Sequence, residues 1–181
     1  MGMRDLTQGK EGKQILKFAL PMLLGNIFHQ LYNVIDSVIV GNFIGKEALA
    51  AVGASFPVIF VFFALVLGVT SGSTVVISQY FGAKENDKVK RTIDTLFIML
   101  FFASIFISVL GIVFSRQIFI LLKLPSEVMP LAETYLKIFF GGSIAFFGFI
   151  GTSASLRGLG DSKTPLYFLI ISTITNIGLD L

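Results

Sequence analysis

Two aspartates in strongly apolar stretches are the residues of this sequence best suited to chemistry. Asp36 lies in GNIFHQLYNVIDSVIVG, and Asp180 lies in TNIGLDL, four residues after Asn176 and so on the same helical face. An ionised aspartate in hydrocarbon costs at least about 3 kcal/mol, so such residues usually remain for a functional reason. Counted along each helix from its predicted cytoplasmic end, Asp180 lies at about 22 Å and Asp36 at about 30 Å. Two carboxylates with an amide beside them can hold one cation or share one proton.

Oxygen ligands alone favour a hard ion over a soft transition metal. The sequence therefore predicts a site for Na⁺ or H⁺ formed by Asp36, Asn176 and Asp180. The structural alternative is an aspartate kept neutral by a neighbouring helix, where one hydrogen bond contributes about 1 kcal/mol.

The helix that carries Asp36 also has a polar face. At about 100° per residue, one arc of roughly a third of the circumference collects the polar side chains. These are Asn26, His29, Tyr32, Asn33 and Asp36. A polar face inside a bilayer must contact protein or a water-filled cavity, so these residues are predicted to line a cavity. Hydrogen bonding between helices is the common alternative for His29 and Asn33.

The composition requires a membrane around these residues. Hydrophobic residues make up 54% of the 181-residue chain, charged residues 14%, and the mean hydropathy is +0.85. Runs of roughly 20 apolar residues are long enough to cross a bilayer. The sequence predicts an all-α polytopic membrane protein with spans at about 15–41, 49–81, 93–114, 130–156 and 165–181. Because the fifth run stops without a cap or flanking charge, we expect it to be truncated.

The charges predict the orientation of these spans. Ten basic residues fall in the N-terminal segment through Lys17 and in the second and fourth connections, against four on the other side. The positive-inside rule then places the N-terminus in the cytoplasm and the chain in the cytoplasmic membrane. A net charge of +3 gives no argument for nucleic acid, and the absence of cysteine excludes thiol chemistry.

Several residues have structural explanations. Pro130 is predicted at the first position of the fourth helix, and Thr164 is predicted to cap the fifth before Pro165. Glu133 should pair with Lys137 four residues later. The small residues of Gly68-x-x-x-Gly72 and of GGSIAFFGFIGTSAS should let helices approach closely.

The tetrapeptide GLGD, which ends at Asp161, matches a signature of intramembrane aspartyl proteases. Those enzymes need this aspartate within a span and a second aspartate directly after a tyrosine. Here Asp161 lies in a polar connection and Asp36 follows Ile35. The chain is therefore not expected to be an enzyme.

Several segments together resemble the multidrug and toxic compound extrusion (MATE) family of transporters, in particular its prokaryotic branch. They are ALPMLLGN, LYNVIDSVIVG, GKEALAAVGASFP, GVTSGSTVVISQYFGAK, LRGLGDSKTP and NIGLD, in this order along nearly the whole chain. The resemblance implies twelve helices in two lobes, of which this chain supplies the first four and most of the fifth. The sixth helix and the C-terminal lobe, its expected partner, are then absent.

The resemblance also implies roles for individual residues. Residues matching Asp36, Asn176 and Asp180 bind Na⁺ or H⁺ in similar proteins, and a bend at the proline matching Pro21 accompanies this binding. The implied activity is antiport, in which cation or proton entry drives export of amphipathic, often cationic, organic compounds. No cofactor beyond the coupling ion is expected. The alternatives are a lipid-linked oligosaccharide flippase of the same superfamily and a structural membrane subunit that transports nothing.

Overall fold

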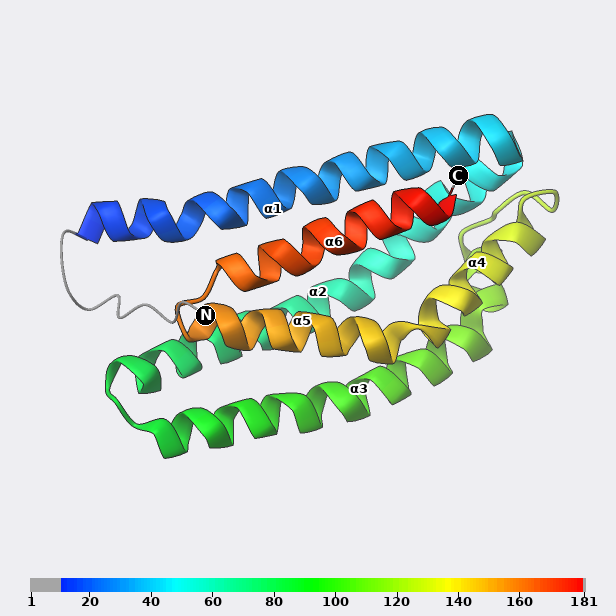
Figure 1. Ribbon diagram of the computed structural model, residues 1–181. Coiled ribbons are helices and arrows are strands. Elements are labelled where there is room, and N and C mark those ends of the chain that lie inside the picture. Colours follow the sequence, from blue (N-terminus) through cyan, green and yellow to red (C-terminus); the bar gives the residue numbers. More distant parts are fainter. Residues whose placement is uncertain (1–10, 181) are drawn as a thin grey trace. The chain divides into compact units, whose positions relative to one another are not determined.

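The computed structural model describes residues 11–180, apart from the side chains of Glu11, Lys13 and Asp180 (Figure 1). Within these residues the protein contains helices and no strand, which confirms the predicted all-α fold class. The helices are α1 (Glu11–Ile39), the π-helix η1 (Val40–Ile44), α2 (Lys46–Gly82), α3 (Asn86–Leu121), α4 (Met129–Gly141), α5 (Ser143–Gly158) and α6 (Lys163–Asp180).

The first four predicted apolar runs lie within these helices, and the fifth lies within α6 as far as residue 180. By length and composition α2 and α3 could each cross a membrane, and α4 with α5 could form a third span. Helices α1 and α6 carry the polar residues of the predicted site, which lower their mean hydropathy. The crossing of the bilayer by these two helices stays a prediction.

The fourth run is broken in the middle, where the sequence predicted one continuous helix. The axes of α4 and α5 meet at an angle of 51°. Two successive glycines, Gly141 and Gly142, favour a helix end at this point because glycine has low helix propensity. The Gly142 N–H is shared between the carbonyls of Ile138, at 3.1 Å, and Phe139, at 3.2 Å, which tightens the last turn of α4. Pro130 is the second residue of α4, one position later than predicted.

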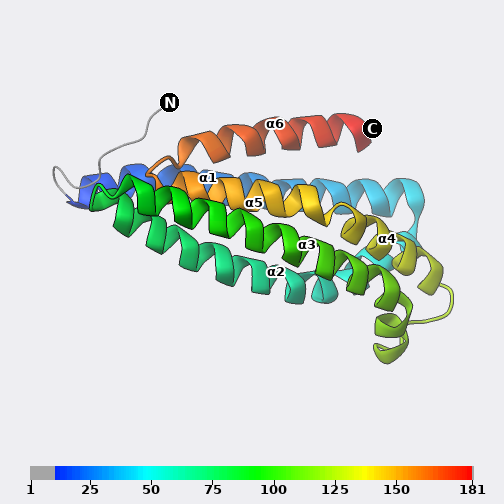
Figure 2. The ribbon, with the colours of Figure 1, turned by 90° about the horizontal axis from the view of Figure 1, so that it is seen from below.

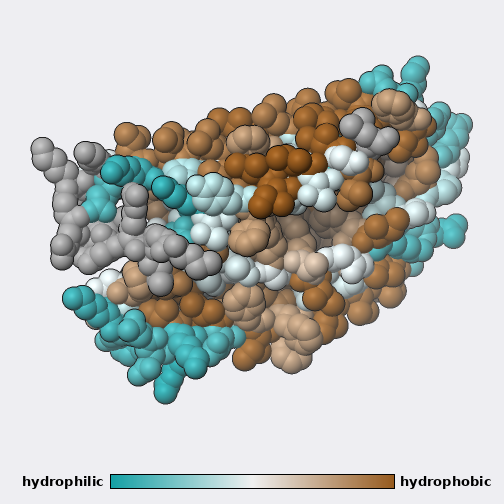
Figure 3. All heavy atoms as spheres, in the orientation of Figure 1, coloured by the Kyte–Doolittle hydropathy of each residue, from teal (hydrophilic) through white to brown (hydrophobic). Residues whose placement is uncertain are grey.

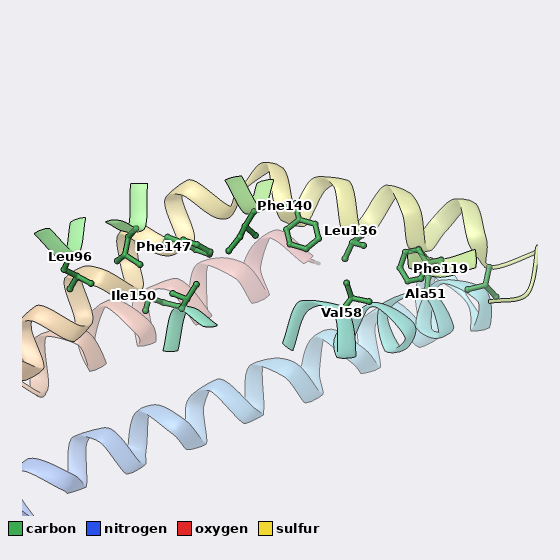
Figure 4. Close-up of a cluster of buried hydrophobic side chains, with 13 residues drawn as sticks. Ala51, Val58, Leu96, Phe119, Leu136, Phe140, Phe147 and Ile150 are labelled. Atoms are coloured by element: carbon green, nitrogen blue, oxygen red, sulfur yellow. The ribbon is translucent and has the colours of Figure 1, made fainter. Parts of the chain in front are cut away.

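The chain divides into two compact units, and each of α2, α3 and α5 contributes a part to both. Unit 2 comprises residues 39–70 and 96–151. Its core is a cluster of apolar side chains from α2, α3, α4 and α5, several of which are labelled in Figure 4. The Phe140 ring is 1% exposed and packs edge-on against Phe62, with 5.0 Å between the ring centroids.

Unit 1 comprises residues 11–38, 71–95 and 152–180 of the described chain. Helices α2 and α5 approach closely in it. The Thr74 hydroxyl donates a hydrogen bond to the Ala154 carbonyl at 3.2 Å, and a Cβ at Gly158 would lie 2.7 Å from Ile77 Cγ2. This confirms close approach at Ala154, within the predicted small-residue stretch 141–155.

The other predicted small-residue pair makes no such contact. A Cβ added at Gly68 or at Gly72 would meet no described atom within 4 Å. The spacing of two glycines shows that close approach is sterically allowed, but a partner helix must also face them.

The outward side of α1 is apolar. Ile27, Leu31 and Val34 are 55%, 50% and 60% exposed, and Figure 3 shows hydrophobic residues along this helix. Hydrophilic residues gather instead at the turn between α2 and α3 (Figure 3). Exposure of large aliphatic side chains along a helix is typical of a surface that faces lipid tails.

Candidate functional site

Helix α1 carries Asp36 near its end and Pro21 in its interior. Pro21 is buried. Because proline has no N–H, the Lys17 carbonyl four residues earlier lacks its helical hydrogen bond, and the helix is weakened at this turn. The helix nevertheless continues through Pro21 from Glu11 to Ile39. The bend at Pro21 that the resemblance implies stays a prediction.

Helices α1 and α6 run in the same direction in unit 1 (Figures 1 and 2) and touch at Gly25. A Cβ at Gly25 would lie 3.6 Å from Leu169 Cδ2 and 3.7 Å from Leu166 Cδ1. These are ordinary van der Waals distances, so the side chains of α6 fill the space beside the glycine. The contact fixes the register, because Gly25 lies level with the turn of α6 between Leu166 and Leu169.

The register relates the two aspartates. Asp36 follows Gly25 by 11 residues, which is about 16 Å further along the helix and only about 20° around it. Asp180 follows Leu169 by the same number of residues. Ideal helix geometry therefore predicts that Asp36 lies on the face of α1 that carries Gly25, and that the backbone of Asp180 lies on the face of α6 that carries Leu169, at about the same height. Asp36 is half-buried, and the side chain of Asp180 lies outside the described residues.

Asn176 shares this face of α6, seven residues after Leu169. Its side-chain oxygen Oδ1 is buried and accepts no hydrogen bond from any described residue. Thr173, one turn earlier, is 8% exposed, and its hydroxyl bonds to no described residue. Thr173 was not among the predicted site residues. A buried oxygen without a donor is costly, so Oδ1 of Asn176 is available to a proton donor or a cation.

No group of three or more His, Asp or Glu side chains is close enough to hold a metal ion in the described part of the chain. The predicted sodium ligands are two acids and one amide, and the side chain of one of these acids, Asp180, lies outside the described residues. The ion site therefore stays a prediction.

The polar arc of α1 is split into two parts. Tyr32 and Asp36 are half-buried, whereas Asn26, His29 and Asn33 are exposed. His29 Nδ1 lies 3.2 Å from the Asn33 amide nitrogen, and its ring centroid lies 6.2 Å from that of Tyr32. Because an amide nitrogen can only donate, His29 Nδ1 accepts in this arrangement. The cavity that these residues are predicted to line stays a prediction.

Asp161 is buried, 5% exposed, and caps the start of α6. Its Oδ1 accepts hydrogen bonds from the N–H groups of Lys163 and Thr164, both at 3.0 Å, and its Oδ2 accepts one from the Thr164 hydroxyl at 2.6 Å. Burial alone would raise the pKa of Asp161, but these hydrogen bonds outweigh it and lower the pKa from its ordinary 3.8. The prediction that Thr164 caps this helix is wrong, because Thr164 lies inside the helix and donates to Asp161. The capping role explains Asp161 without protease chemistry.

Two acids away from the site have basic partners. Glu133 accepts a bond from Lys137 at 2.6 Å, as predicted, and Glu85 pairs with Lys88 at 2.7 Å. Lys88 also lies over the Tyr80 ring, 5.3 Å from its centroid. Of the basic residues used to predict the orientation, Arg4 and Lys10 lie outside the described residues.

Long apolar helices, together with a helix that carries a half-buried aspartate, are typical of membrane transporters. The MatE family model matches residues 21–181, and the chain belongs to this family. The chain is thus a multi-pass membrane protein of a transporter family, which confirms the resemblance seen in the sequence.

Individual relatives show the same similarity. The probable multidrug resistance protein YpnP of Bacillus subtilis (strain 168) is 36% identical over 172 residues, which are 95% of this chain and 39% of YpnP. A MATE solved in the bent conformation matches 95% of this chain and 38% of its own, at 26% identity and a TM-score of 0.87. One solved in the straight conformation matches 99% and 39%, at 26% identity and a TM-score of 0.85. The chain therefore spans about two fifths of the length of these relatives.

Proposed function

We propose that this protein is a cation- or proton-coupled antiporter that exports amphipathic, often cationic, organic compounds across the cytoplasmic membrane. Asp36, Asn176 and Asp180 form its coupling site, and its N-terminus is cytoplasmic. The observation that supports this most strongly is the packing of Gly25 on α6. This contact supports a common height for the two aspartate positions, because Asp36 follows Gly25 and Asp180 follows Leu169 by 11 residues each.

The donor set suits a hard ion or a proton. It offers carboxylate oxygens from two helices and the buried Oδ1 of Asn176, which has no donor among the described residues. Carboxylate and amide oxygens are ligands for hard cations, and two neighbouring carboxylates can instead retain one shared proton. In either case the bound positive charge neutralises part of the site and removes the repulsion between α1 and α6.

Neutralisation of the two aspartates can move α1, because the turn weakened by Pro21 lies close to the contact with α6. Pro21 precedes Gly25 by one turn, so the weakened turn of α1 is next to the contact with α6. An ion shifts a conformational equilibrium only if it binds the two states with different affinities. A bend at Pro21 would change the distance between Asp36 and α6 and so supply this difference. The MATE structures solved in a bent and in a straight conformation support two states for members of this family.

The test is export of a cationic dye by the full natural protein in a drug-sensitive bacterial host. Asp36→Asn should reduce export to the level of cells without the protein while leaving its amount in the membrane unchanged. Glu133→Gln is the matched control, because Glu133 has its own partner in Lys137 and lies on α4. Unchanged export by Asp36→Asn would refute the coupling role. Absence of dye export by the unaltered protein would favour the flippase or the structural subunit.

A further inference from the structure

Arg157, in the last turn of α5, is a charged side chain that pairs with none of the described residues. It is half-buried, and its side chain forms no ion pair or hydrogen bond with any described side chain or backbone group. A guanidinium carries five N–H donors and stays charged in proteins, so partial burial without an acceptor is unfavourable.

The acceptors nearest along the chain are already used. Both carboxylate oxygens of Asp161, four residues later, bind the start of α6. The carbonyls at the end of α5 accept backbone N–H groups, with 2.8 Å from Asp161 N to Leu156 O and 3.0 Å from Gly160 N to Arg157 O. Arg157 is therefore needed neither to cap its own helix nor to balance Asp161.

The position of Arg157 indicates which anion it could bind. It lies where an apolar helix ends and the polar turn to α6 begins, which is the level of lipid headgroups for a helix of a membrane span. Lys163, at the start of α6, is exposed and also has no acidic partner among the described residues. The planar fork of arginine matches the oxygens of a phosphate, and a second cation nearby favours a lipid with net negative charge.

We propose that Arg157 binds the phosphate of an anionic phospholipid at the turn between α5 and α6. This site is separate from the proposed coupling site, since it lies in the polar turn rather than along the packed face that carries Asp36 and Asn176. The bound lipid neutralises a charge that the described residues leave unpaired, and it links the end of α5 to the membrane surface.

The test compares lipid binding by the full natural protein in neutral detergent. Phosphatidylglycerol and phosphatidylcholine are added separately, and bound lipids are counted by native mass spectrometry together with the unfolding midpoint. We expect phosphatidylglycerol to bind more tightly and raise the midpoint. Arg157→Gln should weaken this binding roughly tenfold, because it removes a charge-assisted hydrogen bond. Arg157→Lys should weaken it less.

Arg91→Gln is the matched control, because Arg91 is an exposed arginine near the start of α3. It should leave phosphatidylglycerol binding unchanged. Equal binding of the two lipids, or full retention by Arg157→Gln, would overturn the proposal and indicate an acidic partner outside the described residues. Equal stabilisation by inorganic phosphate alone would also overturn it. If Arg157→Gln does not accumulate, the comparison of Arg157→Lys with the unaltered protein decides the question. Dye export is measured in parallel, so failure of the coupling proposal is recorded independently.

Discussion

Among the glycines of unit 2, Gly111 approaches another side chain most closely, and this gives a sharp test of how the helices pack. Gly111 of α3 lies directly against the ring of Phe140 of α4, and a Cβ added at Gly111 would overlap the Cγ, Cδ2 and Cε2 atoms of that ring. Phe140 is 1% exposed and packs against Phe62, so its ring cannot turn away from a new methyl group without displacing its neighbours. We predict that Gly111→Ala destabilises the protein although alanine is the better helix former.

The magnitude follows from two opposing effects. Overpacking a buried site costs about 1–3 kcal/mol, and the rigid ring places this case at the upper end of that range. Replacement of a helical glycine by alanine returns about 1 kcal/mol. The expected net loss is about 1–2 kcal/mol, which corresponds to a fall in the unfolding midpoint of several degrees.

The assay is a double-mutant cycle on the full natural protein in detergent. Phe140→Leu alone should lose about 1–2 kcal/mol through the cavity that it leaves. Combined with Gly111→Ala, it should lose less than the sum of the single changes, because the new methyl group occupies space that the ring has left. Gly68→Ala is the control, since a Cβ there meets no described atom within 4 Å. Strict additivity of Gly111→Ala and Phe140→Leu would refute the packing described.

Three further predictions concern other contacts. Asp161→Ala should lower the free energy of unfolding by about 1 kcal/mol near neutral pH, because the helix cap is lost. Folding lowers the pKa of Asp161 from 3.8, so the ionised carboxylate stabilises the folded protein only while it stays deprotonated. The difference in unfolding free energy between the two proteins should therefore disappear when unfolding is measured at pH values below the lowered pKa. Gly158→Ala should cost about 1–3 kcal/mol in thermal unfolding, since its Cβ would lie 2.7 Å from Ile77 Cγ2. Glu133→Gln should change the unfolding free energy by at most about 0.5 kcal/mol, because both side chains of its pair with Lys137 remain partly exposed, and a larger effect would indicate a buried network.

The helices could be predicted from the sequence because hydrophobic run length is nearly sufficient in a membrane protein. In hydrocarbon every backbone group must be bonded within the chain, so an apolar run of this length has few alternatives to a helix. Local pairs such as Glu133 with Lys137 were also predictable, since helix geometry alone brings them together.

Helix ends and breaks were less predictable, because several residues compete for each role. Asp161 and Thr164 can both cap a helix, and the turn at Gly160, with a positive φ of 82°, decides in favour of Asp161. The pair Gly141 and Gly142 is compatible with either a continuous membrane helix or a break. Packing around Phe140 and the buried Ser143, whose hydroxyl donates to the Ser104 carbonyl at 3.3 Å, accompanies the break.

The relation between Asp36 and Asp180 shows what a helical wheel omits. A wheel gives each residue an angle, but neither a partner helix nor a height, and distances counted from helix ends are poor guides to height. Helix α1 has 14 residues before the contact at Gly25, whereas α6 has only three before Leu166. Counting outward from the contact instead brings Asp36 level with the stretch of α6 that ends at Asp180. The contact of Gly25 with α6 thus gives the alignment of the two helices on which the proposed coupling site depends.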